Sequence, residues 1–162
     1  LARAKAEDVL ATLDADGDEA SDLVLGCDSL LELDGEVHGK PADVAEATAR
    51  WHRMRASTGT LHTGHWLVDR RDTRDGGTGG LVGGTASTVV HFADLGDEEV
   101  AAYVATGEPL RVAGAFTIDG LGGPFVAGIE GDPSNVVGVS LPLLRELALE
   151  LGVRWHDLST AG

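Results

Sequence analysis

The sequence predicts an α/β domain in which helices flank a mixed central sheet. Segments with helical and with strand periodicity are interspersed along the 162 residues, which favours helices packed on a sheet. Residues 61–70 alternate in strand fashion, and a β-branched segment returns at 85–92 after a stretch with six glycines, 72–84. This pattern predicts a long hairpin with an exposed tip. A chain of this length can bury a core of its own, so we expect one domain over residues 1–162.

The N-terminal residues predict a helix, a loop and a strand that lead to a first candidate residue, Asp28. Residues 2–13 place apolar side chains on one stripe and predict a helix, which the polar loop 14–18 follows. The short apolar strand 23–25 then delivers Cys27 and Asp28 to its C-terminal end.

Turn and capping signals define the next two elements. Residues 30–37 read as a hairpin arm with an Asp-Gly turn. Asp43 opens a helix over 42–57, and Gly59 is expected to end it.

The C-terminal half continues the alternation. Three acids in a first turn predict a helix over 97–105, which Gly107 ends. The remaining predicted elements are two short strands, an amphipathic helix and a closing strand, at 112–118, 125–129, 141–151 and 153–155.

The charge balance excludes polyanionic partners. The chain carries 27 acidic residues against 12 lysines and arginines, a net charge of -15, which repels nucleic acid polymers and anionic membranes. A small phosphate ester stays compatible, because a lysine, an arginine and a divalent metal can meet its charge locally. The single cysteine, Cys27, excludes an intrachain disulfide, and no apolar run approaches the roughly 20 residues of a membrane span. We therefore expect a cytoplasmic protein.

Asp28 is the first candidate for chemistry. It follows an apolar strand in a glycine-containing turn, and ligands of α/β folds gather at the C-terminal ends of strands. A carboxylate there can accept a proton from water or bind Mg²⁺. The alternative is a cap or turn residue held by its own backbone. We expect its neighbour Cys27 to be a small buried thiol.

Lys40 lies between Gly39 and Pro41. Glycine lets a ligand approach the backbone and proline fixes the chain direction, so this lysine can neutralise a phosphate. The alternative is a solvated lysine that precedes a helix.

Glu108 follows Gly107 at a predicted helix end, where the negative end of the macrodipole disfavours an unpaired acid. A partner is therefore expected, and the candidates are Arg111, Lys40 or a metal ion. A purely structural pair with Arg111 is the alternative.

Two further clusters are assigned no chemistry. Residues 130–135 gather two acids, a serine and an asparagine, and an Asx-type turn is favoured there over a metal or base site. His62, His65 and His91 fall on facing strands, but His62 and His65 point to opposite faces, so no histidine metal site is predicted.

Seven collinear segments resemble the Maf family of nucleoside triphosphate pyrophosphatases. Each motif is weak alone, and their order over residues 1–155 makes the resemblance specific. The segments are 25–29, 35–41, 57–64, 88–92, 103–109, 113–116 and 129–138.

The resemblance implies a central sheet split by a nucleotide cleft, similar to inosine triphosphate pyrophosphatases. It implies hydrolysis of a modified or non-standard nucleoside triphosphate to the monophosphate and pyrophosphate, with Mg²⁺ or Mn²⁺ and with a homodimer as the family's assembly. By the same resemblance, Asp28 is the proton acceptor for the attacking water and a metal ligand. Ser29, Lys40 and Glu108 bind substrate, and Glu108 also binds the metal.

Two departures from the family pattern matter. The chain has no match to the family's opening Ser-x-Ser-Pro-Arg-Arg phosphate loop, so a nucleotide-binding regulator of septum formation without turnover is the alternative function. A structural acidic partner module is a further alternative. The pyrimidine branch has Ile-Gln-Gly where this chain has 118–120. An ionised Asp119 only accepts hydrogen bonds, which suits a substrate base with N–H donors, such as guanine or 7-methylguanine.

Overall fold

The chain divides into two compact units. The computed structural model describes residues 1–16 and 23–158. The first unit comprises Leu1–Asp28, Thr63–Ala86 and Val139–Gly162, and the second comprises Ser29–His62 and Ser87–Gly138. Three long strands contribute residues to both units, so each unit contains part of the sheet.

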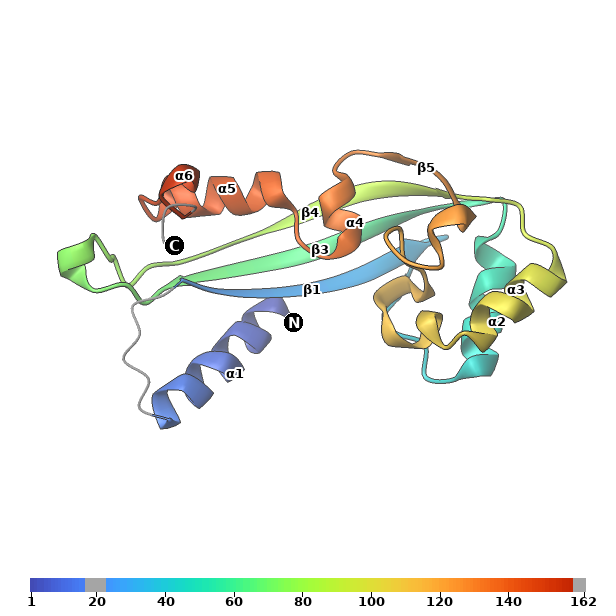
Figure 1. Ribbon diagram of the computed structural model, residues 1–162, viewed down its shortest axis with the longest axis horizontal. Helices are drawn as coiled ribbons and strands as arrows, with labels where there is room; N and C mark the ends of the chain where they lie inside the picture. Colours follow the sequence, from blue (N-terminus) through green and yellow to red (C-terminus); the bar gives the residue numbers. More distant parts are fainter. Residues whose placement is uncertain (17–22, 159–162) are drawn as a thin grey trace. The chain divides into compact units, whose positions relative to one another are not determined.

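The five strands form one sheet in the order β2-β1-β3-β4-β5 (Figure 1). Their bounds are Leu23–Leu33 for β1, Glu36–His38 for β2, Thr58–Asp69 for β3, Leu81–Phe92 for β4 and Val126–Glu130 for β5. The β1–β2 and β4–β5 pairs are antiparallel. The Phe92 N–H donates to Ser57 and the Asp69 N–H to Gly80, so β3 and β4 are antiparallel too. The predicted α/β class is confirmed. A mixed sheet was expected, but these three strand pairs are all antiparallel.

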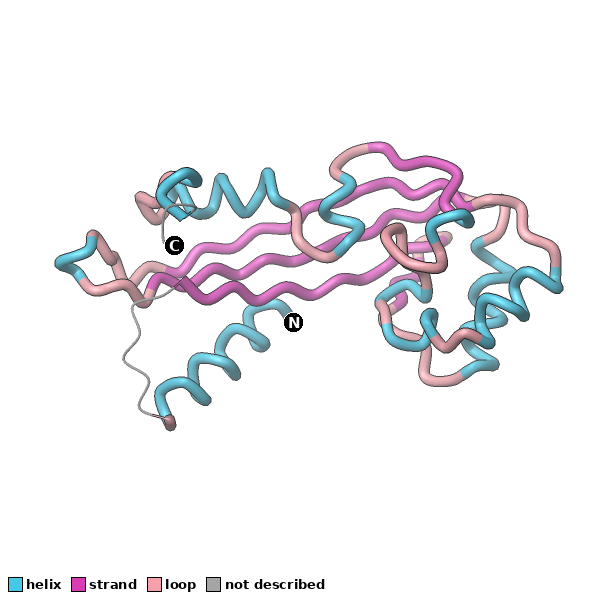
Figure 2. The backbone as a smooth tube through the Cα atoms, in the orientation of Figure 1, coloured by secondary structure: helices cyan, strands magenta, loops and turns pink. Residues whose placement is uncertain are grey.

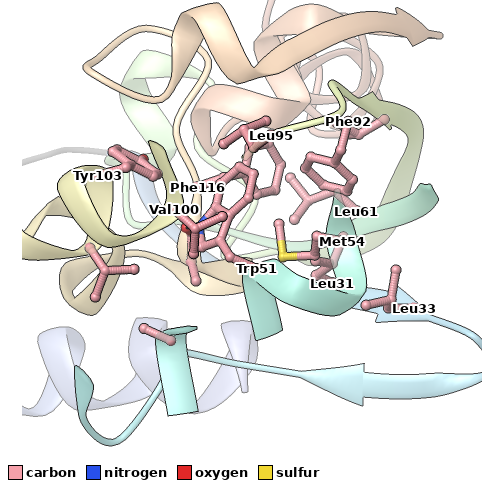
Figure 3. Close-up of a cluster of buried hydrophobic side chains, with 14 residues drawn as sticks. Leu31, Leu33, Trp51, Met54, Leu61, Phe92, Leu95, Val100, Tyr103 and Phe116 are labelled. Carbon is pink, nitrogen blue, oxygen red and sulfur yellow. The ribbon is translucent and has the colours of Figure 1, made fainter. Parts of the chain in front are cut away.

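The core of the second unit surrounds Trp51. This residue comes from α2 (Val44–Met54), is fully buried, and meets the rings of Phe92 and Tyr103 edge-on (Figure 3). Its indole N–H donates to the carbonyl of Ala115 at 2.8 Å, so the one polar atom of the ring is satisfied. Helix α3 (Asp97–Ala105) adds Tyr103 to this cluster. The core therefore fixes α2, α3 and the 113–116 segment on the sheet residues of this unit.

The first unit has two smaller apolar clusters. Helix α1 (Ala2–Ala15) contributes Ala6, which packs with Val24 and Val68. Helix α5 (Leu141–Glu150) packs Leu147 against Leu67, and the short helix α6 (Trp155–Leu158) follows it. Among the described residues, no helix has the length and apolarity required to cross a membrane.

Most predicted elements are present, and the helix over 97–105 matches α3 at both ends. The predicted strand 112–118 is wrong: it contains a short 3₁₀ turn, η3 (Ala113–Ala115) (Figure 2), and positive φ angles at Gly114 (74°) and Ala115 (64°) are incompatible with an extended strand. The closing strand 153–155 is also wrong, because α6 begins at Trp155.

Several boundaries also differ, and β4 begins at Leu81, inside the predicted tip 72–84. The predicted strand 23–25 is the start of an eleven-residue strand, β1. Helix α2 ends at Met54 rather than at Gly59, since Ala56 already has a φ of 55°. The predicted loop 14–18 begins inside α1, and its residues 17 and 18 lie outside the described residues.

A buried carboxylate closes the β3–β4 hairpin. The side chain of Asp69 is fully buried and accepts hydrogen bonds from the Arg71 guanidinium at 2.9 Å and from the Thr78 N–H and hydroxyl at 2.9 Å. The hydrogen bonds from Arg71 hold the pKa of Asp69 well below its usual range. Arg71 also donates to the carbonyl of Leu151, so one ion pair connects the hairpin to the end of α5.

We predict that Asp69→Ala lowers the free energy of unfolding by about 3–5 kcal/mol, because it leaves the guanidinium of Arg71 without its buried partner. Urea unfolding measures this loss. The matched control is Arg74→Ala, which removes the exposed pair of this arginine with Asp72 and should be nearly neutral. Equal losses in the two variants would contradict this account.

Candidate active site

Asp28 lies in the middle of β1, not in a turn after it. The strand continues because residues 29–33 keep a strand pattern, with Leu31 and Leu33 in the core. The Asp28 side chain is 20% exposed and forms an ion pair through Oδ1 with Lys5 of α1. Lys5 also donates to the carbonyl of Cys27 at 3.2 Å. Oδ2 has no hydrogen-bond partner in the described part of the chain, so its lone pairs are not used by the fold.

A close approach of α1 to β1 places Lys5 on Asp28. A Cβ atom at Gly26 would overlap the carbonyl oxygen of Ala2 and lie 2.8 Å from the nitrogen of Ala6. Only glycine permits this contact, and one turn of α1 beyond Ala2 brings Lys5 to the carboxylate. The sequence analysis missed Lys5, because the two partners are 23 residues apart and the lysine alone is an ordinary helical residue.

Cys27 is half-buried rather than fully buried as expected, and burial raises the pKa of its thiol. Ser29 is the next residue along β1 after Asp28. Successive side chains of a strand point to opposite faces, so Ser29 lies on the same face as Leu31 and Asp28 on the other. The predicted contact of Ser29 with a nucleotide stays a prediction.

Lys40 lies in a loop whose backbone is fixed by hydrogen bonds to the preceding residue, Gly39. The carbonyl of Gly39 accepts a hydrogen bond from the buried Arg50 at 2.5 Å and another from the Gly114 N–H at 3.2 Å. Glu46 pairs with Arg50 and also accepts the Ala42 N–H. The Lys40 side chain is exposed and forms no hydrogen bond or ion pair with any described residue. A fixed backbone with an uncommitted ammonium suits phosphate recognition.

Glu108 has a partner set that the sequence did not predict. It is the first residue of a 3₁₀ helix, η2 (Glu108–Arg111), and neither Arg111 nor Lys40 contacts it. Its Oε1 accepts hydrogen bonds from the Tyr103 hydroxyl at 2.8 Å, the Thr117 hydroxyl at 2.6 Å and the Gly122 N–H at 2.9 Å, and its Oε2 accepts the Leu121 N–H at 3.0 Å.

These hydrogen bonds decide the charge of Glu108. Burial alone would raise the pKa of Glu108, but the donors from Thr117, Leu121, Tyr103 and Gly122 outweigh it and lower the pKa to about 2. Glu108 is therefore ionised at neutral pH. Its assignment as a metal ligand stays a prediction.

Asp119 lies at the tip of the loop that Glu108 holds. It is exposed and has no hydrogen bond or ion pair among the described residues. Leu121, two residues on, is 59% exposed. The loop thus exposes a hydrogen-bond acceptor, Asp119, and an apolar side chain, Leu121, two positions apart.

The histidines and the 130–135 cluster have structural partners. His62 bridges Ser87 and Glu32, and His91 bridges Thr58 and Glu130. Asp132 caps α4 (Pro133–Val137) and accepts the Ser134 N–H, which confirms the predicted Asx-type turn. No group of three or more His, Cys, Asp or Glu residues that could hold a metal ion occurs within residues 1–16 and 23–158.

A divalent cation still fits Asp28. Mg²⁺ is commonly bound by one or two carboxylates, with waters and substrate phosphates completing its octahedral shell. The Oδ2 atom of Asp28 supplies one such ligand without a cage of protein side chains. The donor chemistry therefore suits Mg²⁺ or Mn²⁺ rather than a tetrahedral zinc site.

The described residues thus form an α/β protein with a lysine-paired carboxylate in the first unit and an exposed, unpaired lysine in the second. The model of the family described as Maf-like protein matches residues 1–151, and the chain belongs to this family.

Three relatives show how far the similarity extends. A protein of Salinispora tropica named nucleoside triphosphate pyrophosphatase is 59% identical over all of this chain and 69% of its own length. Proteins of the same name from Streptomyces avermitilis and Nostoc punctiforme are 56% and 49% identical, over 99% and 94% of this chain and 73% and 71% of their own lengths.

The close contact at Gly26 can be tested directly. We predict that Gly26→Ala lowers the free energy of unfolding by about 1–3 kcal/mol, because the added methyl must displace the backbone of α1. Urea unfolding measures this. Gly64→Ala is the matched control in the same unit, since its Cβ would meet nothing closer than 3.4 Å. A Gly26→Ala variant as stable as the wild type would show that α1 does not lie on β1 in this way.

Proposed function

We propose that this chain hydrolyses a nucleoside triphosphate to the monophosphate and pyrophosphate. The observation that carries the proposal is the match of the Maf-like family model to residues 1–151, together with relatives named nucleoside triphosphate pyrophosphatase. The lysine-paired carboxylate of Asp28 and the exposed ammonium of Lys40 supply the charges that such a reaction requires.

In the proposed reaction a water oxygen attacks the α-phosphorus, and the bond from that phosphorus to the bridging oxygen of the leaving pyrophosphate breaks. Asp28 accepts the proton that the water loses, through the Oδ2 atom that has no partner in the described residues. Lys5 holds the other oxygen and so orients the carboxylate. Lys40 is assigned to the phosphate chain, where a cation stabilises charge on the leaving group.

A divalent cation is part of the proposal. The ligands that the resemblance suggests for it are Asp28 and Glu108, with phosphate oxygens of the substrate completing its shell. A cation on Oδ2 of Asp28 would occupy the atom that accepts the proton, so these two roles of the atom are alternatives, and we assign it to the proton. When bound, such a cation neutralises the negative charge of the triphosphate. We propose Mg²⁺ or Mn²⁺ as this cation. We also propose that the protein is located in the cytoplasm and that it assembles as a homodimer.

We also assign base recognition to the loop that carries Asp119. Its exposed carboxylate accepts hydrogen bonds and offers no donor. Guanine presents two adjacent N–H donors to such a group, whereas thymine and uracil present one N–H between two carbonyls, so a guanine-type edge is favoured.

The experiment that tests the proposed function is product analysis with dTTP, UTP, GTP and 7-methyl-GTP in the presence of Mg²⁺. We expect equimolar monophosphate and pyrophosphate, and in ¹⁸O-labelled water the label in the monophosphate. Release of orthophosphate and diphosphate would contradict attack at the α-phosphorus. No product, despite nucleotide-induced stabilisation against heat, would support the regulator instead. A preference for dTTP would remove the argument from Asp119.

A further inference from the structure

We propose that Glu108 is a positioning residue: its carboxylate holds the loop 117–122 in one conformation, and that conformation sets which base the chain accepts. The inference rests on the proposed function and deepens it, because it assigns base selectivity to a residue that the resemblance places on substrate and metal.

The carboxylate joins the core of the second unit to the loop. On the core side, Tyr103 is 3% exposed and its ring packs against Trp51 and Phe125. Its hydroxyl donates to Oε1 of Glu108 at 2.8 Å. The buried aromatic cluster therefore fixes one oxygen of the carboxylate.

On the loop side, three donors reach the same carboxylate. They are the Thr117 hydroxyl and the N–H groups of Leu121 and Gly122. The Gly122 N–H also donates to the Thr117 hydroxyl at 3.2 Å, and the Gly123 N–H donates to the carbonyl of Gly120 at 3.1 Å. Both ends of the loop are thus tied to one charged group.

Two glycines leave room for this arrangement. A Cβ atom at Gly120 would lie 2.6 Å from Oε2 of Glu108, and one at Gly122 would overlap the Tyr103 hydroxyl. The loop residues between the anchored ends, Ile118 and Asp119, form no hydrogen bond to any described residue. Their position therefore depends on the anchored ends, and the position of Asp119 depends on Glu108.

The four donors use most of the capacity of Glu108. A carboxylate offers about four lone-pair sites, and Glu108 already accepts four hydrogen bonds. Three of the four reach Oε1 and one reaches Oε2, so a metal ion on Glu108 would have to bind Oε2 beside the Leu121 N–H or displace a donor. A positioning role and a metal-ligand role therefore predict different defects when the charge is removed.

The test compares wild type and Glu108→Gln with GTP and dTTP over a range of Mg²⁺ concentrations. The amide turns one acceptor oxygen into a donor, which cannot accept from the loop. We expect the ratio of kcat/KM for the preferred base to that for the other to fall by at least about tenfold, mainly through KM, because hydrogen bonds to a charged group are lost. The Mg²⁺ concentration for half-maximal rate should stay unchanged.

Two variants at Thr117 distinguish an effect on the loop from a general loss of folding. Thr117→Val removes one donor to Glu108 and the acceptor of one hydrogen bond from the Gly122 N–H, and it should shift the base ratio in the same direction by less. Thr117→Ser keeps the hydroxyl and should keep the wild-type ratio. Glu99→Gln is the control, since Glu99 accepts the Gly96 N–H at the start of α3 and does not touch the loop. If Glu108→Gln does not fold, the Thr117 pair decides by the same criterion.

The outcomes are distinct. A lower base ratio with unchanged Mg²⁺ dependence supports the positioning role. A raised Mg²⁺ requirement with an unchanged ratio overturns it and assigns Glu108 to the metal, and a wild type without base preference overturns it as well. A wild type that hydrolyses no nucleotide would instead contradict the proposed function, and nucleotide-binding ratios measured by calorimetry would then test the loop alone.

Discussion

The contact between α1 and β1 at Gly26 is the constraint on which the candidate chemistry depends. Without a side chain at this position, the helix backbone lies directly on the strand, and Lys5 reaches the carboxylate of Asp28. A larger residue would separate the two elements and leave a partly buried acid without its cation. A backbone contact, rather than a charge motif, therefore creates the pair.

The proposed substrate is an anion, although the chain has a net charge of -15. Individual cations are held at defined positions: Lys5 by its ion pair with Asp28, and Arg50 by its hydrogen bond to the Gly39 carbonyl. Arg50 is buried and holds the loop under Lys40, so the charge that remains exposed there is the ammonium of Lys40. The excess of acid keeps polyanions away, while a small ligand has to meet only a few positive groups.

Glu108 is likewise a charged side chain that holds backbone in place, because it accepts hydrogen bonds from the N–H groups of Leu121 and Gly122. Four donors converge on this carboxylate, and together they tie a buried tyrosine to an exposed loop. Positioning by a buried or half-buried charge is costly unless every acceptor is used. Here nearly all of them are, which explains why the group stays ionised.

Much of this was accessible from the sequence. Periodicity and capping signals located α2, α3 and α5, and collinear motifs indicated the family over nearly the whole chain. Local patterns failed where tertiary contacts decide the conformation. The positive φ angles at Gly114 and Ala115 bring the Ala115 carbonyl to Trp51, 64 residues away in sequence. Lys5 and the donors to Glu108 were missed for the same reason, because no local spacing links them to their partners.

The central claim is that Asp28 takes the proton of the attacking water. The most direct measurement is the turnover of Asp28→Asn at saturating nucleotide and Mg²⁺, with folding verified by its unfolding transition and with Glu7→Gln, an exposed acid of α1, as control. The account predicts a fall in kcat of at least about 100-fold for Asp28→Asn and no change for the control. A folded Asp28→Asn variant whose kcat stays within about threefold of the wild type would contradict it.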